Sequence, residues 1–212
     1  DGMIDEKRVL HFDGKGRVLF DEIDRNLDGE IDLRIEKIYT GGGLIREINT
    51  DQYADGIIEK KEAFNYLGKT LLDKTIDLGA DGEIDSIQRW NHSEDGRLLS
   101  ITLDSNADGE IDSGRWFHYD ETGLLLSEIN KESGIQTSSK FYAYNDLGEL
   151  LYIDSDSERD NDDEIDRRQF ESEDIENQLK VIEIDLNMDG EIDEIHTAHF
   201  DTEGRLRKIE KD

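Results

Sequence analysis

Three stretches of this chain carry the same pattern of oxygen-bearing side chains at alternating positions. They run over 24–32, 104–112 and 185–193, with Asp at positions 1, 5 and 9, Asn at position 3, Gly at position 6 and Glu at position 7. Oxygens at positions 1, 3 and 5 of a tight loop converge on one centre, position 6 needs glycine for the turn, and positions 7 and 9 add oxygens. Because every donor is a hard oxygen, the pattern favours calcium or magnesium, and calcium accepts more protein ligands.

Two further stretches keep most of this pattern. Over 77–85, Gly79 replaces the side chain at position 3, and over 158–166, Asp163 replaces the glycine. We therefore predict Ca²⁺ as a cofactor held by five loops. The expected ligands are Asp24, Asn26, Asp28, Glu30, Asp32, Asp77, Asp81, Glu83, Asp85, Asp104, Asn106, Asp108, Glu110, Asp112, Glu158, Asp160, Asp162, Glu164, Asp166, Asp185, Asn187, Asp189, Glu191 and Asp193.

The other copies of the loop are incomplete. Over 51–59, Tyr53 stands at position 3, so Asp51, Asp55 and Glu59 are expected to form a weak site at most. The segment 130–137 has lost the pattern, and no metal is expected there. An alternative interpretation is that all these stretches are ordinary Asp/Asn/Gly turns on an acidic surface. Their recurrence in register with a repeat favours calcium.

That repeat has a period of about 27 residues, marked by the Asp-Gly step of the acidic loop and by a second glycine. Between the two glycines lies a segment of about eight residues that usually ends in an aromatic residue, and a short apolar run follows the second glycine. Both segments are short and rich in Ile, Leu and aromatic residues, which is typical of β-strands. The second glycine can supply the positive φ of a tight hairpin turn.

The predicted fold class is therefore all-β, with about eight 27-residue β-hairpin repeats in an elongated, coiled antiparallel sheet or solenoid. A single hairpin is marginal in water, so neighbouring repeats are expected to stack. The alternative is a small β-propeller with two repeats per blade. We expect residues 1–212 to form a single array, with units at about 1–23, 24–49, 50–76, 77–103, 104–129, 130–153, 154–184 and 185–212.

The acidic loops resemble the first nine positions of an EF-hand and the Asp-x-Asp-x-Asp-Gly-x-x-Asp loops of dockerins and thrombospondin type 3 repeats. The resemblance ends at position 12, where an EF-hand has a bidentate Glu. Here that position holds Ile35, Gln88, Arg115 or His196. No helix–loop–helix is therefore expected, and the missing ligand is expected to come from water or a neighbouring repeat.

The other half of the unit resembles the YD repeats of RHS-type bacterial surface and toxin-shell proteins. The resemblance rests on stretches such as Tyr119-Asp-Glu-Thr-Gly-Leu-Leu, Phe12-Asp-Gly-Lys-Gly-Arg-Val and Tyr144-Asn-Asp-Leu-Gly-Glu-Leu. It implies a long spiral β-sheet on secreted bacterial proteins. Calcium loops are not part of the usual YD pattern, so a shell function is not carried over.

Composition excludes several classes of function. The 55 acidic and 25 basic residues give a net charge of −30, which repels nucleic acid and anionic membranes. No apolar stretch is long enough to insert into a membrane. There is no cysteine, so no disulfide stabilises the fold. Because no nucleophile motif, phosphate-binding glycine loop or unique carboxylate pair is present, an enzyme is not expected.

Calcium loops without the position-12 Glu are expected to bind in the ~10⁻⁴ to 10⁻³ M range of extracellular modules. The sequence therefore predicts an extracellular or cell-surface structural protein, such as a filament or surface-array subunit. Asp212 at position 1, with Asp1 and Asp5 at positions 5 and 9, is expected to form a loop shared by two copies, so self-association is head-to-tail. The alternatives are an adhesin or carbohydrate-binding module of a larger secreted protein, using Trp90 and Trp116, and an accessory domain of an enzyme.

Overall fold

The structure is a computed structural model of the chain, and it consists of β-strands, loops and turns. It describes residues 6–157, 165–174, 178–201 and 203–212. These residues divide into two compact units, one within Asp1–Asp112 and the other within Ser113–Asp212. Among the described residues, no helix is long and apolar enough to cross a membrane.

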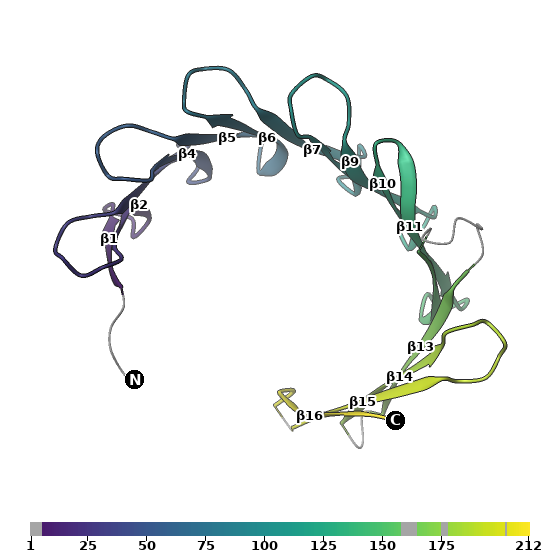
Figure 1. Ribbon diagram of the computed structural model, residues 1–212. Coiled ribbons are helices and arrows are strands. Elements are labelled where there is room, and N and C mark those ends of the chain that lie inside the picture. Colours follow the sequence, from purple (N-terminus) through teal and green to yellow (C-terminus); the bar gives the residue numbers. More distant parts are fainter. Residues whose placement is uncertain (1–5, 158–164, 175–177, 202) are drawn as a thin grey trace. The chain divides into compact units, whose positions relative to one another are not determined.

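The first unit is a sheet of eight antiparallel strands that pair in the order of the sequence. Figure 1 shows the acidic loops along one edge of this sheet and the tight turns along the other. The strands are β1 (Lys7–Phe12), β2 (Val18–Asp24), β3 (Leu33–Tyr39), β4 (Ile45–Asp51), β5 (Lys60–Leu67), β6 (Thr70–Leu78), β7 (Ser86–His92) and β8 (Leu98–Asp104).

The second unit follows the same plan, again with neighbouring strands antiparallel and in sequence order. Its strands are β9 (Ser113–Tyr119), β10 (Leu125–Glu132), β11 (Ile135–Tyr144), β12 (Leu150–Asp156), β13 (Arg167–Asp174), β14 (Leu179–Asp185), β15 (Glu194–Phe200) and β16 (Leu206–Lys211). The all-β class and the hairpin repeat predicted from the sequence are thus confirmed.

The propeller alternative is wrong, because consecutive hairpins pair with each other without interruption inside a unit. The β4–β5 ladder joins Glu47 to Ala63, and the β12–β13 ladder joins Tyr152 to Phe170. Blades of two hairpins would break the ladder after every fourth strand. Inside each unit, the acidic loops therefore stand at junctions between consecutive hairpins of the sheet.

The aromatic residue that ends the first strand of a repeat ties it to the preceding hairpin. The Tyr39 hydroxyl of β3 donates to the Val18 carbonyl of β2 at 2.8 Å, and the Tyr144 hydroxyl of β11 donates to the Leu125 carbonyl of β10 at 3.0 Å. Arg17 also lies over the Tyr39 ring, 4.6 Å from its centroid. These contacts show that Tyr39 and Tyr144 each tie two neighbouring hairpins together.

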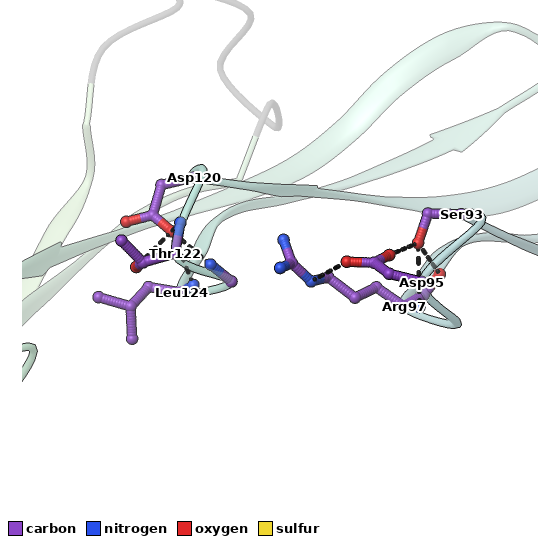
Figure 2. A network of polar contacts seen from close by, with 7 residues as sticks. Ser93, Asp95, Arg97, Asp120, Thr122 and Leu124 are labelled. Atoms are coloured by element: carbon purple, nitrogen blue, oxygen red, sulfur yellow. Dashed lines mark hydrogen bonds and ion pairs between the residues drawn. The ribbon is translucent and has the colours of Figure 1, made fainter.

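The polar residue after the aromatic closes the tight turn. Asp120 accepts hydrogen bonds on one oxygen from the backbone N–H groups of Thr122, Gly123 and Leu124 at 2.8, 2.7 and 2.9 Å (Figure 2). The Thr122 hydroxyl donates to the same oxygen, and these bonds lower the pKa of Asp120. Gly123 has a φ of 99°, in the region that favours glycine. The turn edge is thus closed by the chain's own groups.

Apolar burial in this sheet is small. Among the described residues, the buried apolar side chains are Leu33 and Ile184, while most of the buried residues are polar. Apolar side chains such as Ile35 and Ile48 are only half-buried. Because each unit is a single layer with little apolar burial, the hydrogen bonds of its strand ladders carry much of its stability.

Candidate metal centres

The acidic loops are closed by a backbone bond across their base. The N–H at position 9 donates to the carbonyl of the residue before position 1, from Asp32 to Ile23 at 2.8 Å and from Asp193 to Ile184 at 2.8 Å. The loop over 104–112 follows β8 and closes in the same way onto Leu103 at 2.9 Å. Each loop is therefore a fixed ring at the end of a strand.

The loops also share a backbone conformation that the sequence pattern does not predict. Position 4 has a positive φ of 49–61° in five loops, at Leu27, Ala54, Ala80, Ala107 and Met188. Position 6 is glycine with φ between 89° and 96° in the same loops. A non-glycine residue at positive φ costs on the order of 1–3 kcal/mol, so these loops hold a strained backbone at position 4.

The position-1 carboxylates are buried. Asp24 is 3% exposed and Asp104 is 1% exposed. Their Oδ2 atoms accept hydrogen bonds from the loop glycines, Gly29 at 3.1 Å and Gly109 at 3.0 Å. Their Oδ1 atoms, which we call the open oxygens, have no hydrogen-bond partner among the residues that the structure describes. A buried carboxylate oxygen without a partner is costly, and a bound cation would relieve that cost.

Positions 3 and 5 face each other inside the loop. In the first loop, the Asn26 side-chain carbonyl accepts from the Asp28 N–H at 3.0 Å, and the Asn26 amide donates to Asp28 Oδ2 at 3.0 Å. The N–H of Glu30 donates to Asp28 Oδ1 at 2.9 Å. The loops over 104–112 and 185–193 repeat all three bonds.

Position 9 turns back toward the start of the loop. Asp32 accepts from the Arg25 N–H at 2.7 Å, and Asp193 accepts from the Leu186 N–H at 2.7 Å. Asp112 accepts from both the hydroxyl and the N–H of Ser105, which lowers its pKa.

The position-7 side chains Glu30, Glu83, Glu110 and Glu191 are exposed. The pattern requires only the backbone carbonyl of this position for a metal ion.

The loop expected to be weakest has the closest set of carboxylates. Oxygens of Asp51, Asp55 and Glu59 lie within 4.8 Å of one another, a convergence found for no other group of three such residues in the described ranges. Tyr53 at position 3 is 68% exposed and leaves the loop interior. However, both oxygens of Asp51 accept hydrogen bonds, from the N–H groups of Asp55 at 3.1 Å and Gly56 at 2.8 Å.

In the loop over 77–85, as in the loop over 51–59, both oxygens of the position-1 carboxylate accept hydrogen bonds. Asp77 is 5% exposed, and its two oxygens accept from the N–H groups of Asp81 at 3.1 Å and Gly82 at 3.0 Å. Asp85 accepts from the Leu78 N–H, as position 9 does elsewhere. This loop therefore keeps the ligand positions without an open oxygen.

In the acidic loop that follows β12, Asp156 has the place that Asp24 has in the loop over 24–32. Asp156 ends β12 and is 5% exposed, and Asp166 accepts from the N–H and hydroxyl of Ser157 at 2.8 and 2.7 Å. These are the bonds that link positions 2 and 9 elsewhere, so this loop is two residues longer. Sequence reasoning missed Asp156. The expected ligands Glu158, Asp160, Asp162 and Glu164 lie outside the described residues.

The segment 130–137 and the loop expected to be shared by two copies of the chain remain to be placed. Ser133 and Gly134 form a two-residue turn between β10 and β11 where other repeats have an acidic loop. Asp1 and Asp5 lie outside the described residues, and Asp212 extends the β15–β16 ladder through two backbone bonds with Ile195, at 2.9 and 3.1 Å.

The two tryptophans lie in different units, Trp90 in β7 and Trp116 in β9. Both are half-buried, and the Lys131 ammonium lies 5.6 Å from the centroid of the Trp116 ring. Lys131 belongs to β10, which pairs with β9, so this contact lies within the sheet of the second unit.

Comparison with known proteins supports the fold. No family model matches the chain, and no curated protein matches it. A chain in the crystal structure of TcdB2-TccC3-Cdc42 is 12% identical with a TM-score of 0.54, over 98% of this chain and 14% of that chain. This chain thus spans about one seventh of that protein's length. At this identity the likeness shows the fold alone, and it agrees with the YD-repeat resemblance at that level.

Two further solved structures are more distant. A chain of TcdB2-TccC3 is 11% identical with a TM-score of 0.34, over 95% of this chain and 15% of that one. A porin-like protein from Bacteroides uniformis is 9% identical with a TM-score of 0.36, over 93% of this chain and 59% of that one. By the first comparison alone, the chain is similar in fold to a segment of a toxin-complex protein of RHS/YD type.

Proposed function

We propose that this chain is a calcium-binding structural repeat protein of the cell exterior, in which ions hold the junctions between hairpins. The single observation that carries the proposal is the pair of open oxygens on the buried side chains of Asp24 and Asp104. Both belong to loops whose remaining positions offer hard oxygens at the spacing that calcium uses. A divalent cation satisfies a buried carboxylate oxygen and offsets the repulsion among its neighbours.

The position of the loops gives calcium a structural effect. Each loop starts at the last residue of one hairpin and ends where the next hairpin begins, as Asp24 and Asp32 do between β2 and β3. An ion bound by both ends of the loop therefore fixes the junction. Because it binds the folded loop and not the unfolded chain, it adds stability by mass action.

The cell exterior and self-assembly belong to the same proposal. Without a bidentate Glu at position 12, the loops suit the millimolar calcium found outside cells. Calcium also reduces the net charge of −30, which otherwise keeps copies of the chain apart. Assembly into filaments or arrays is therefore expected to require calcium. Small-angle scattering of the protein in EDTA and in 5–10 mM calcium tests this, and unchanged monomeric scattering would reject assembly.

Thermal melting with and without calcium tests the function itself. We expect calcium to raise the melting temperature of the wild-type protein, and to raise it much less in the double variant Asp24→Asn/Asp104→Asn. The matched control is Glu94→Gln/Glu121→Gln, which removes the same charge at two exposed positions outside the loops. An equal calcium response in all three proteins would refute the proposal.

A further inference from the structure

The loops fall into two groups according to where one backbone N–H is directed. In the loops over 24–32 and 104–112, the position-5 N–H donates to the position-3 Asn, from Asp28 to Asn26 at 3.0 Å and from Asp108 to Asn106 at 3.1 Å. In the loops over 51–59 and 77–85, the same N–H donates to the position-1 carboxylate at 3.1 Å. Position 3 holds Tyr53 or Gly79 in the second group, neither of which places an acceptor inside the loop.

The open oxygens follow this division. Asp24 and Asp104 have an Oδ1 without a hydrogen-bond partner in the described part of the chain, and both belong to the first group. Asp51 and Asp77, which are 3% and 5% exposed, have both oxygens satisfied by backbone N–H groups. The four carboxylates are similarly buried but differ in their hydrogen bonds, and position 3 is the ligand position at which both loops of the second group differ from both loops of the first.

The loop over 185–193 agrees with this division. Its Asp189 N–H donates to Asn187 at 3.2 Å, as in the first group. The Asp185 Oδ1 accepts only a long bond of 3.3 Å from the Asn187 N–H, and its Oδ2 accepts from Gly190 at 2.9 Å. An Asn at position 3 thus accompanies a position-1 oxygen that is free or weakly bound in all three loops.

We infer that the position-3 Asn, beyond its expected place among the ligands, is a positioning residue that diverts the position-5 N–H and thereby keeps the position-1 oxygen open for calcium, so that the Asn loops fill first. The inference rests on the proposed function and sets the order in which its sites load. In the loops over 51–59 and 77–85, both oxygens of the position-1 carboxylate already accept hydrogen bonds. An incoming calcium ion competes with one of these bonds, which lowers its affinity by about tenfold or more. The loops over 24–32, 104–112 and 185–193 therefore form the tight group, and the loops over 51–59 and 77–85 form the weak group.

Tyr53 offers a direct test, because its loop lacks only the position-3 acceptor. Asp51, Asp55 and Glu59 already converge within 4.8 Å, and Tyr53 is 68% exposed, so replacing it disturbs little packing. Its φ is not among the positive values, unlike that of Gly79. The variant Tyr53→Asn supplies the acceptor, and Tyr53→Ala removes the ring without supplying one. Because Tyr53 also borders Arg25 and Asn26 of the first loop, the Ala variant controls for that contact.

The first measurement needs no metal. In EDTA, through-hydrogen-bond NMR couplings of the Asp55 N–H are expected to connect it to the Asp51 carboxylate in the wild type and in Tyr53→Ala. In Tyr53→Asn they are expected to connect it to the new side-chain amide at position 3. A coupling to Asp51 that persists in Tyr53→Asn would overturn the positioning role.

The second measurement counts ions by native mass spectrometry at graded calcium. Tyr53→Asn is expected to bind one more ion than the wild type at concentrations that fill only the tight group, while Tyr53→Ala matches the wild type. Equal counts in all three proteins, or a gain in Tyr53→Ala, would refute the inference but leave the proposed function standing. No bound ion in any of the three would refute the proposed function, and the inference with it.

Discussion

Two aspartates of the first unit have the same burial and different partners. Asp21, in the β1–β2 hairpin, and Asp104, at the start of an acidic loop, are each 1% exposed. Asp21 receives the Arg8 guanidinium on both oxygens, with Nε at 2.7 Å from Oδ1. Asp104 receives one backbone N–H, from Gly109 at 3.0 Å. The hairpin thus supplies its own countercharge, and the loop does not.

The same contrast separates the two edges of the sheets. At the turn edge, one Asp120 oxygen accepts three backbone N–H groups and a hydroxyl, so the turn is complete as it stands (Figure 2). At the loop edge, the buried Asp104 carboxylate has an open oxygen, and Ala107 at position 4 of the same loop has a strained backbone. The turns and hairpins are thus satisfied by the chain's own groups, and the proposed function assigns to a bound ion the part that is missing in the acidic loops. The following predictions can break or sharpen this contrast.

The largest effect is expected for Asp104→Asn, and it depends on calcium. At a hundredfold excess of calcium over its Kd, one site contributes about 2.7 kcal/mol, most of which the variant loses. In EDTA the variant is expected to be as stable as the wild type or more stable, because a buried charge without a countercharge has been removed. Chemical unfolding in both conditions measures the difference. Equal destabilisation with and without calcium would show that Asp104 is a purely structural residue.

The next largest effect is expected for Asp120→Ala in the turn after β9. This variant leaves the backbone N–H groups of Thr122 and Leu124 without their acceptor, while Gly123 keeps its bond to the carbonyl of residue 120, and it should lower the melting temperature by several degrees. Because the turn needs no ion, the decrease should be the same in EDTA and in calcium. Melting curves in the two buffers check this. A decrease found only in calcium would mean that the turn edge also depends on metal.

The difference in stability between the wild type and the variant Asp21→Asn should depend on pH. The Arg8 hydrogen bond lowers the Asp21 pKa below its usual value. A carboxyl with a lowered folded-state pKa contributes stability above its unfolded pKa of about 3.9, and loses that contribution as the pH falls through the lower folded value. The wild type should therefore exceed the variant in stability near pH 6, and the gap should close below about pH 4. Urea unfolding in EDTA across this range measures the gap, and a constant gap would contradict the ion pair.

The smallest effect is expected for Ala107→Gly, at position 4 of a loop. Ala107 has a φ of 53°, which glycine adopts without strain, so the variant should be more stable by about 0.5–1 kcal/mol or unchanged. The control Gly109→Ala, at a φ of 94°, should be destabilised by at least as much. Urea unfolding of both variants provides the test. A loss of stability in Ala107→Gly would show that the loop backbone is not strained.

Much of the fold was predictable from the sequence, because the repeat fixes the order of loops, strands and turns. The spacing of Asp24, Gly29 and Asp32 gives the loop and its ends, and the aromatic–Asp step at Tyr119 and Asp120 gives the turn. The extent of the core was not predictable. Alternating apolar residues indicate a buried face, but in a single-layer sheet most of them stay half-buried.

The places of the candidate loops were predictable from the sequence, and their internal geometry was less so. The segment after β12 is so rich in acidic residues that several registers fit the pattern, and Asp156 was therefore missed by two residues. The convergence of Asp51, Asp55 and Glu59 depends on the reach of a Glu at position 9 and on Tyr53 leaving the loop, which spacing alone does not reveal. The direction of the position-5 N–H depends on the backbone geometry of the loop, which the spacing of residues does not reveal.

Ion counting is the most direct test of the central claim. The purified protein, dialysed against millimolar calcium and analysed for bound metal, is expected to hold at least two ions per chain, one for each open oxygen. The variant Asp24→Asn/Asp104→Asn should hold two fewer. A wild-type protein without bound ions at millimolar calcium would contradict the account and leave an acidic β-repeat whose loops are ordinary turns.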